Sequence, residues 1–352
     1  MRFALTSDQA ALREAVRDLL RAECPPAVVR AGWPGAEEAD AARVRRVWAQ
    51  LAEMGVVGAA VPEEAGGLGL DACALVGLLE ETGRAALPLP VVETAFVAGP
   101  LLAAAGEQAL VERLVDGDLL VGAALDGSGL VPYARVANAL LVGDARSIAV
   151  AEQQQTTAHA DVRLVAPAAF EAAASIDGAR APGRVAEDAG AALDAEPAAL
   201  AAAWERGVLG SAAQLLGLSR TLLTMATQYA HERRQFGVAI GTFQAVKHQL
   251  ADALLAIEFA APAVLRAAWS LDAGAPQAGR DVAMAKALAS DAALKTAATA
   301  LQVHGAIAYT VEYDLHLFAK RVWASARAWG DADWQRARVA AALGLTHEGA
   351  TR

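Results

Sequence analysis

Residues 229–252 read YAHERRQFGVAIGTFQAVKHQLAD, and within this stretch one helical run ends and another begins. The run that ends here, 200–232, has few residues that would interrupt a helix. The run that begins here, 243–271, places its apolar residues on one stripe at helical spacing. Between them, 235–242 contains two glycines and favours a turn. The stretch therefore predicts two long helices with a short connection, as is typical of an antiparallel bundle.

The rest of the chain divides by its hydrophobic pattern. Two more helical runs, 279–302 and 312–343, extend the C-terminal bundle, and the first third is helical from residue 6 and again over 37–54, 71–84, 91–105 and 107–115. Short apolar runs bounded by Gly, Asp and Pro predict strands at 119–125, 138–144, 147–152 and 161–167, while the alanine-rich segment 172–200 fits either structure. We therefore expect a mainly α fold with an N-terminal helical domain (1–117), a short middle β domain (118–190) and a C-terminal antiparallel helical bundle (191–352).

Composition excludes several classes of protein. Of the 352 residues 55% are hydrophobic but only 5% are aromatic, which argues against disorder. The net charge of −10 disfavours broad contact with nucleic acid. The most apolar long stretch, 85–106, is interrupted by Pro88, Glu93 and Pro100, so we expect no membrane span. The first 20 residues carry acidic side chains where a signal peptide has an uninterrupted apolar stretch, so we expect no signal peptide. Two cysteines make neither a disulfide framework nor a metal site, so we expect a cytoplasmic protein without metal.

Several segments carry a family resemblance. Residues 229–252 resemble the signature segment of the acyl-CoA dehydrogenase family at Arg233, Gln235-Phe236-Gly237, Ile240, Phe243-Gln244-Ala245-Val246, His248 and Leu250-Ala251-Asp252. Residues 302–321, QVHGAIAYTVEYDLHLFAKR, are similar to the family's Gln-x-x-Gly-Gly segment, and 61–85 are similar to an N-terminal turn and helix. The resemblance implies an FAD-dependent α,β-dehydrogenation of an acyl-CoA thioester, with an electron-transferring flavoprotein as acceptor.

The resemblance also implies a cofactor site. The family uses residues matching Arg233, Gln235, Phe236, Gln302 and Gly305 on the ADP half of an FAD that belongs mainly to a neighbouring subunit. Physically, a guanidinium at a helix end can bind a pyrophosphate through paired, charge-assisted hydrogen bonds. Two alternatives remain: Arg233 complements the C-terminal end of its helix, and Phe236 packs in the core. Ala306 replaces the second family glycine, and its Cβ restricts a close approach of the backbone to phosphate.

The catalytic base of the family is not found where it is expected. In most members a Glu removes the proton α to the thioester carbonyl, and counting from Arg321 places it at Gly330. Asp331 is adjacent and is one candidate. Other members place the Glu at the position of Gly207, and Glu205, two residues earlier, is a second candidate. The third alternative, which we favour, is that the chain has no competent base.

The middle region departs from the family as well. The family's flavin contacts in this region are a Thr-Glu-Pro…Gly-Ser-Asp segment and a Trp-x-Thr strand, and the corresponding stretch, 120–144, contains neither. Some bacterial members, notably in sterol side-chain degradation, form α2β2 heterotetramers with one FAD per heterodimer. This chain looks like the degenerate subunit of such an enzyme, sharing FAD across the interface with a homologous partner. The alternatives are a self-sufficient homotetramer with Asp331 as base, and a non-catalytic structural or acyl-CoA-binding scaffold.

Overall fold

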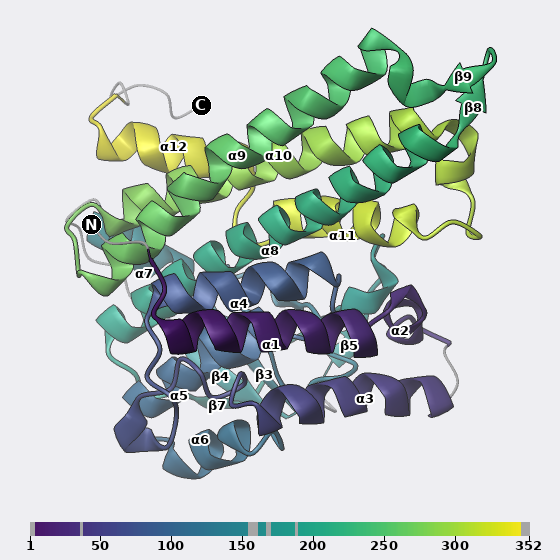
Figure 1. Cartoon of the computed structure of the whole chain (residues 1–352). Helices are drawn as coiled ribbons and strands as arrows, with labels where there is room; N and C mark the ends of the chain where they lie inside the picture. Colours follow the sequence, from purple (N-terminus) through teal and green to yellow (C-terminus); the bar gives the residue numbers. More distant parts are fainter. Residues whose placement is uncertain (1–3, 36–37, 154–160, 167–169, 187–188, 346–352) are drawn as a thin grey trace.

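The computed structural model describes residues 4–35, 38–153, 161–166, 170–186 and 189–345 (Figure 1). Residue 37 of the predicted 37–54 helix and residue 167 of the predicted 161–167 strand lie outside this part. The N-terminal elements are helical: α1 (Ser7–Glu23), α2 (Pro26–Ala31), α3 (Glu38–Glu53), η1 (Glu63–Ala65), α4 (Ala72–Arg84), η2 (Val92–Ala98), α5 (Gly99–Ala104) and α6 (Gln108–Val115). These confirm the helical pattern of the first third, with Thr6 and Asp71 as the N-caps of α1 and α4.

The middle of the chain forms two small sheets. One has the order β1 (Val121–Ala124), β3 (Ala139–Gly143), β4 (Val162–Val165), β7 (Ala191–Ala192), in which only β1 and β3 run parallel. The other has the order β2 (Leu130–Val131), β6 (Gly183–Val185), β5 (Phe170–Ala172), and the short helix η3 (Gly178–Arg180) precedes β6.

The predicted strand at 147–152 is wrong, because these residues belong to the helix α7 (Ala145–Gln153). The carboxylate of Asp144 accepts a hydrogen bond from the backbone N–H of Ser147 at 3.2 Å, as a helix-capping residue does. Ala145, Ile148 and Ala149 are then buried on one side of the helix, which packs on α8. The local cap outweighed the strand preference of a short apolar run.

The C-terminal bundle is built from long helices. Its elements are α8 (Pro197–Glu232), β8 (Arg234–Gln235), β9 (Val238–Ala239), η4 (Ile240–Thr242), α9 (Gln244–Asp272), α10 (Ala278–His304), η5 (Gly305–Tyr309), α11 (Leu315–Arg327) and α12 (Ala332–Ala342). The predicted helix at 312–343 is wrong as a single element. Trp329 and Gly330 adopt φ of +60° and +81°, which ends α11, and Asp331 then caps α12.

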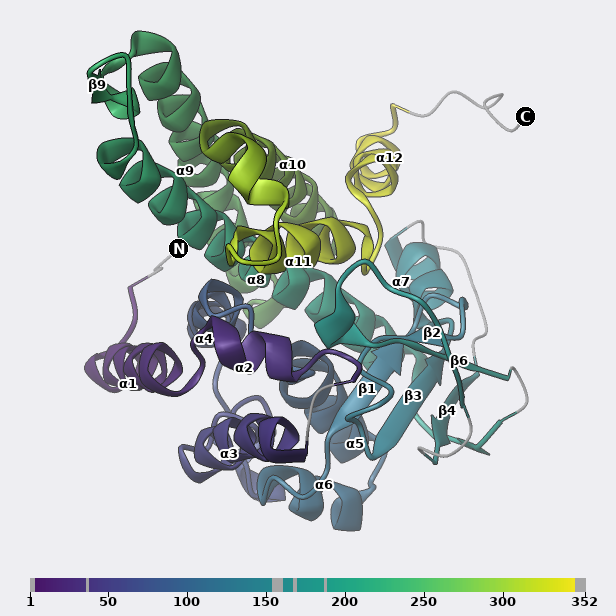
Figure 2. The same cartoon turned by 90° about the vertical axis from the view of Figure 1, so that its right-hand side faces the viewer.

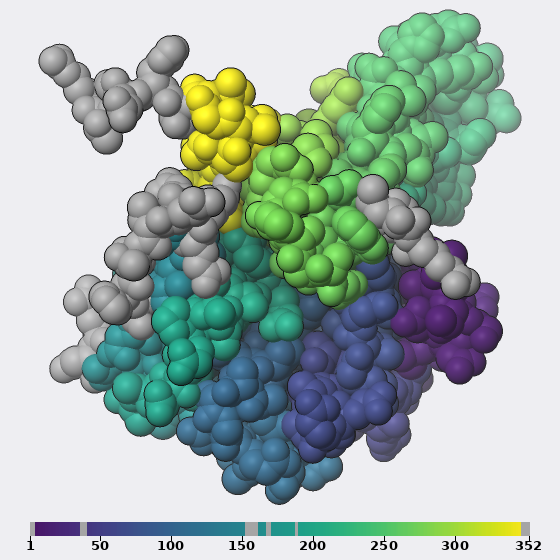
Figure 3. Space-filling view, turned by 90° about the vertical axis from the view of Figure 1, so that its left-hand side faces the viewer, coloured from purple at the N-terminus to yellow at the C-terminus, as the bar shows by residue number. Residues whose placement is uncertain are grey.

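Helix α8 runs through the middle of the molecule and connects its parts (Figure 2). Glycine lets α4 lie against it: a Cβ on Gly217 would come within 2.0 Å of the backbone oxygen of Glu80. The ends of α8 and α9, joined by β8 and β9, project beyond the rest of the chain as the green tip in Figure 3. The mainly α fold with a small β region is confirmed. Among the described helices, none is both long and apolar enough to cross a membrane.

Candidate functional site

The β8–β9 hairpin presents an aromatic side chain to solvent. Phe236 lies at its turn with φ of +53°, an uncommon conformation for a residue with a Cβ. Its side chain is 91% exposed and contacts Phe243 edge-on, with ring centroids 6.2 Å apart. The backbone of the hairpin is closed by a 2.8 Å hydrogen bond from the N–H of Ile240 to the carbonyl of Arg233. Phe236 is therefore not a core residue, which removes one of the two alternatives for this segment.

The polar side chains beside Phe236 have no partner in the described chain. Arg233 is the C-cap of α8, Gln235 belongs to β8, and Gln302 lies in the last turn of α10. All three are exposed, and none of their side chains makes a hydrogen bond or ion pair with a described residue. In particular, the Arg233 guanidinium donates to no carbonyl at the end of α8. These groups are available to bind a ligand or another chain.

Gly305 follows α10 in a conformation that glycine favours. Its φ of +66° and ψ of −140° lie outside the regions open to other residues, and a Cβ there would meet no atom within 4 Å. Its own N–H donates to the carbonyl of Leu301, so this group is already used by the helix. What Gly305 offers a ligand is open space next to the backbone.

A buried histidine joins the two segments that carry these residues. His304 Nδ1 lies 2.8 Å from the carbonyl oxygen of Ala300 and therefore donates, which leaves Nε2 to accept from the Tyr313 hydroxyl at 3.1 Å. Burial lowers the pKa of His304, which favours this neutral form. The ring of Tyr229, in the last turn of α8, stacks on His304 with centroids 4.3 Å apart.

This stack holds the ends of α8 and α10 together. Tyr229 is one helical turn before Arg233, and His304 lies between Gln302 and Gly305. The structure thereby brings the hairpin and the end of α10 to the same end of the bundle. The sequence analysis singled out the neighbouring Gln302 and Gly305 but assigned no role to His304. The sequence shows that Ala300 lies one helical turn before His304. It does not show that the ring of Tyr229, far away in the sequence, stacks on His304.

The first candidate base, Asp331, has a structural role. Its side chain accepts a hydrogen bond from the backbone N–H of Trp334 at 2.9 Å and so caps α12. The carboxylate is exposed to solvent and lines none of the cavities described below. Asp331 is exposed at a helix cap, so it lacks the buried environment that adapts a catalytic carboxylate to proton abstraction.

The second candidate, Glu205, is part of a buried ion pair. Glu205 on α8 is 7% exposed and binds Arg338 on α12, which is 5% exposed. Arg338 also donates to the side-chain oxygen of Gln335 at 3.2 Å, and its guanidinium lies 5.3 Å from the centre of the Trp334 ring. The pair joins α8 to α12. The carboxylate of Glu205 is thus engaged in holding two helices together.

The place where other family members carry a base is filled by an indole ring. A Cβ on Gly207 would lie 2.3 Å from the ring of Trp329, so this tryptophan packs directly on the glycine. Trp329 in turn contacts Trp204, with ring centroids 5.4 Å apart. A glutamate at position 207 could not be accommodated beside this ring.

A cavity of about 330 Å³ remains next to Trp204 and Trp329, between the β1–β2 region and α11. This volume is at the lower end of the range for ligand sites. Its wall includes Arg180, which donates to the Ser325 hydroxyl at 3.3 Å and lies 4.0 Å from Glu93. Arg321, from which the missing base was counted, is buried in an ion pair with Asp177. Arg180 and Arg321 are thus already used to hold the chain together, whereas Arg327, also in the wall, makes no hydrogen bond or ion pair with a described residue.

Among the described residues, no group of three or more His, Cys, Asp or Glu side chains is arranged to hold a metal ion. Lys286 is the buried cation that sequence reasoning missed. It is fully buried in α10 and donates to the carbonyls of Ser325 and Ala326 at 2.9 and 3.3 Å, which satisfies the last turn of α11.

Comparison with known proteins identifies the chain's relatives. Residues 6–117 match the family model "Acyl-CoA dehydrogenase, N-terminal domain", and residues 197–344 match "Acyl-CoA dehydrogenase, C-terminal domain". Acyl-CoA dehydrogenase IpdE2 of Mycobacterium tuberculosis is 32% identical over 90% of this chain and 91% of its own length.

Two solved structures are similar over nearly their whole length. The Tcur3481–Tcur3483 steroid acyl-CoA dehydrogenase, a G363A variant, has a TM-score of 0.83 at 28% identity and covers 96% of this chain and 98% of its own. The ChsE4–ChsE5 complex of Mycobacterium tuberculosis has a TM-score of 0.80 at 26% identity and covers 99% and 100%.

Proposed function

Because the chain belongs to the acyl-CoA dehydrogenase family, we propose that it is a subunit of an FAD-dependent acyl-CoA dehydrogenase and binds the ADP half of an FAD held mainly by a homologous partner subunit. The observation that carries the proposal is the β8–β9 hairpin, with its 91% exposed Phe236 and with Arg233, whose side chain has no partner among the described residues. Such groups add little to the stability of the chain that carries them. They fit a ligand that reaches the hairpin from outside.

The residues present fit the ADP half of FAD chemically. The Arg233 guanidinium offers planar paired donors to a pyrophosphate, and the amides of Gln235 and Gln302 offer further donors and acceptors. Phe236 offers an aromatic face for the adenine, and Gly305 leaves space beside the backbone. The Tyr229–His304 stack holds the β8–β9 hairpin and the C-terminal end of α10 in place relative to each other before the cofactor binds. This reduces the entropy lost on binding.

The residues around Trp204 do not fit a flavin ring and an acyl thioester. The 330 Å³ cavity is walled by Trp329, and Glu205 and Asp331 have structural partners. We therefore assign no step of proton abstraction to this chain. In the proposed complex FAD would supply the hydride acceptor and the proton-abstracting carboxylate would lie on the partner subunit, while Arg233, Gln235, Phe236, Gln302 and Gly305 of this chain would hold the ADP half.

The named relatives support a two-chain enzyme. Both solved relatives carry two protein names, and one of them is a steroid acyl-CoA dehydrogenase. We propose that the partner of this chain is likewise a second acyl-CoA dehydrogenase subunit and that the acyl group is steroid-derived. An electron-transferring flavoprotein remains the proposed acceptor. A self-sufficient enzyme with Asp331 as base is less well supported, because that carboxylate caps α12.

The test is the FAD content of the complex. The chain is purified alone and after co-expression with a candidate partner subunit, and flavin is measured by absorbance after the protein is denatured. We expect the chain alone to be colourless and the complex to contain one FAD per pair of subunits. Arg233→Ala should remove most of the flavin. The matched control Arg113→Ala changes an exposed arginine on α6 and should retain it. Full flavin content in the Arg233→Ala complex, or stoichiometric flavin in the chain alone, would overturn the proposal.

A further inference from the structure

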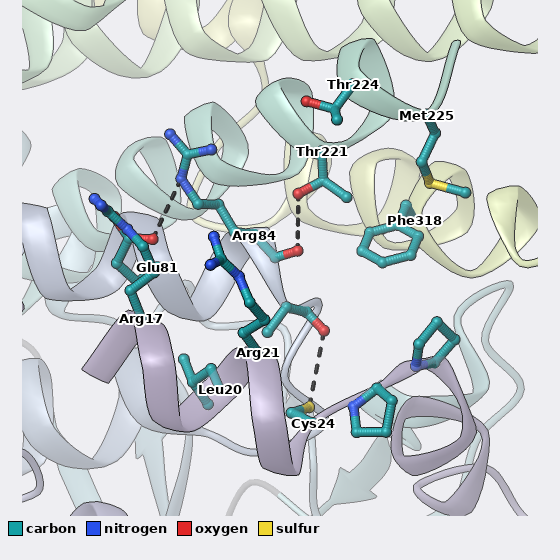
Figure 4. A pocket seen from close by; sticks show the side chains of 13 residues that line it. Arg17, Leu20, Arg21, Cys24, Glu81, Arg84, Thr221, Thr224, Met225 and Phe318 are labelled. Carbon is teal, nitrogen blue, oxygen red and sulfur yellow. Dashed lines mark hydrogen bonds and ion pairs between the residues drawn. The ribbon is translucent and has the colours of Figure 1, made fainter. Parts of the chain in front are cut away.

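A second cavity, of about 600 Å³, lies where the N-terminal helices meet the bundle (Figure 4). Its lining comes from α1, the Pro25–Pro26 turn, the end of α4, the middle of α8 and the start of α11. None of the hairpin residues and none of those around Trp204 belong to it. Its volume lies well inside the range of small-molecule sites.

One side of this cavity carries a group of guanidinium ions. Arg17, Arg21 and Arg84 lie together there, next to the buried carboxylate of Glu81 (Figure 4). Glu81 Oε1 accepts from Arg17 at 2.9 Å, and its Oε2 lies 3.3 Å from Arg84 Nε. Burial favours the neutral acid, but the hydrogen bond from Arg17 and the charges of the nearby arginines outweigh it and lower the pKa of Glu81. Glu81 is therefore an anion shared among several cations.

The single carboxylate in the lining does not neutralise these arginines. Arg13, just outside the lining, also binds Glu81 at 3.0 Å, and Arg84 binds Glu80 at 2.8 Å. Arg21 makes no hydrogen bond or ion pair with any described residue. Arg84 is already engaged, because its Nη2 donates to Glu80 and its Nε lies 3.3 Å from Glu81 Oε2. On a chain with a net charge of −10, the lining of this cavity thus has more arginines than carboxylates, and the donors of Arg21 are unused by the described residues.

The other side of the cavity is apolar. Met225 from α8 and Phe318 from α11 lie opposite the guanidinium groups (Figure 4). Thr221 adds little polarity, because its hydroxyl already donates to the carbonyl of Arg84 at 2.9 Å. The Cys24 thiol is directed at the carbonyl of Ala85 at 3.9 Å, and burial raises its pKa to about 12, so it stays neutral. The cavity therefore has a cationic end and an uncharged, mainly hydrophobic end.

We propose that this cavity binds an amphipathic organic acid. Its carboxylate is held by Arg21, and its hydrocarbon body lies against Met225 and Phe318. A guanidinium binds a carboxylate through two parallel hydrogen bonds, which suits the free donors of Arg21. Burial of the hydrocarbon supplies affinity at roughly 25 cal/mol per Å² of apolar surface removed from water. The site is independent of the FAD-binding hairpin.

Binding of sodium decanoate to the full chain tests the proposal by isothermal titration calorimetry. We expect saturable binding with one molecule per chain, and binding of decanol, which lacks the charge, at least tenfold weaker. Arg21→Ala should weaken decanoate binding by about tenfold to a hundredfold, the usual worth of a hydrogen bond to a charged group. Arg113→Ala, an exposed arginine elsewhere, should bind as the unaltered chain does.

A second variant tests the apolar end. Met225→Glu places a carboxylate beside the proposed hydrocarbon and should abolish decanoate binding, with a thermal melt confirming that the variant is folded. No saturable binding, equal binding of decanol, or equal binding by Arg21→Ala and the unaltered chain would each overturn the proposal. Flavin content of the complex should be the same for Arg21→Ala and the unaltered chain, so failure here is distinguishable from failure of the FAD proposal.

Discussion

Replacing Arg338 by methionine should destabilise the chain far more than a surface arginine replacement does. The guanidinium binds the buried carboxylate of Glu205, donates to Gln335 and lies over the Trp334 ring. Methionine keeps much of the side-chain length and the contact with Trp334 but leaves a buried carboxylate without this cation. Removal of one partner of a buried ion pair costs about 3–5 kcal/mol. Since domains are commonly stable by about 5–15 kcal/mol, this is a large part of the total.

The assay is equilibrium unfolding in urea. The slope of the unfolding free energy against urea concentration must be the same in all variants for their stabilities to be compared. Arg336→Ala is the matched control, because Arg336 is an exposed neighbour on the same helix that pairs with Asp291 and Asp333 at the surface. Its loss should cost about 1 kcal/mol or less. The double variant Glu205→Gln/Arg338→Met removes both charges and should regain much of the stability lost in Arg338→Met.

Two results would refute this account of Glu205. One is a loss in Arg338→Met no larger than in Arg336→Ala. The other is a double variant no more stable than Arg338→Met. Either would mean that Glu205 does not depend on Arg338 for its charge. Loss of turnover in a Glu205→Gln complex that unfolds normally would then favour its role as a catalytic base.

Substitutions at three further positions test other parts of the structure. Gly207→Ala should lower the melting temperature, with a cost of about 1–3 kcal/mol from overpacking against Trp329, whereas a rise would contradict the contact. Asp331→Ala should cost about 0.5–2 kcal/mol as a lost helix cap, and Asp331→Asn should retain most of the stability and all of the turnover of the complex, unless Asp331 is a base. Burial lowers the pKa of Lys286 to about 7, while an unfolded lysine stays protonated to about pH 10.4, so the folded state holds fewer protons between these values. Its stability relative to Lys286→Met should therefore rise with pH from 7 to 9, by at most about 1.4 kcal/mol per pH unit, and parallel pH profiles from urea unfolding would contradict this.

The helices were predictable where long periodic runs left no alternative. Helices α8, α9 and α10 lie within two or three residues of the predicted limits, because their apolar stripes are several turns long. The break between α11 and α12 was not predictable. It depends on the positive φ of Trp329, and a tryptophan in the sequence does not predict this conformation. It also depends on the packing of the Trp329 ring against Gly207, which is far away in the sequence.

The candidate site was predictable as a set of residues but not as a geometry. The motif identified Arg233, Gln235 and Phe236, whereas an apolar side chain such as Phe236 is ordinarily expected to be buried. Its exposure follows from the hairpin turn. The partners of Glu205, His304 and Lys286 lie on other helices and are determined by tertiary packing. Spacing along the sequence does not predict such contacts.

Two surfaces of this chain that face a flavin in the family pattern have opposite physical properties. At one, the chain holds Phe236 exposed at positive φ beside Arg233, whose side chain has no partner among the described residues, an arrangement that adds little to the stability of the chain. At the other, Trp204 and Trp329 pack against each other and on Gly207, and nearby charges are paired, an arrangement that stabilises the chain but closes the space for a base. A self-sufficient enzyme needs both surfaces open to ligand. A subunit that completes the cofactor site of a partner needs only the first, and that is the surface this chain keeps open.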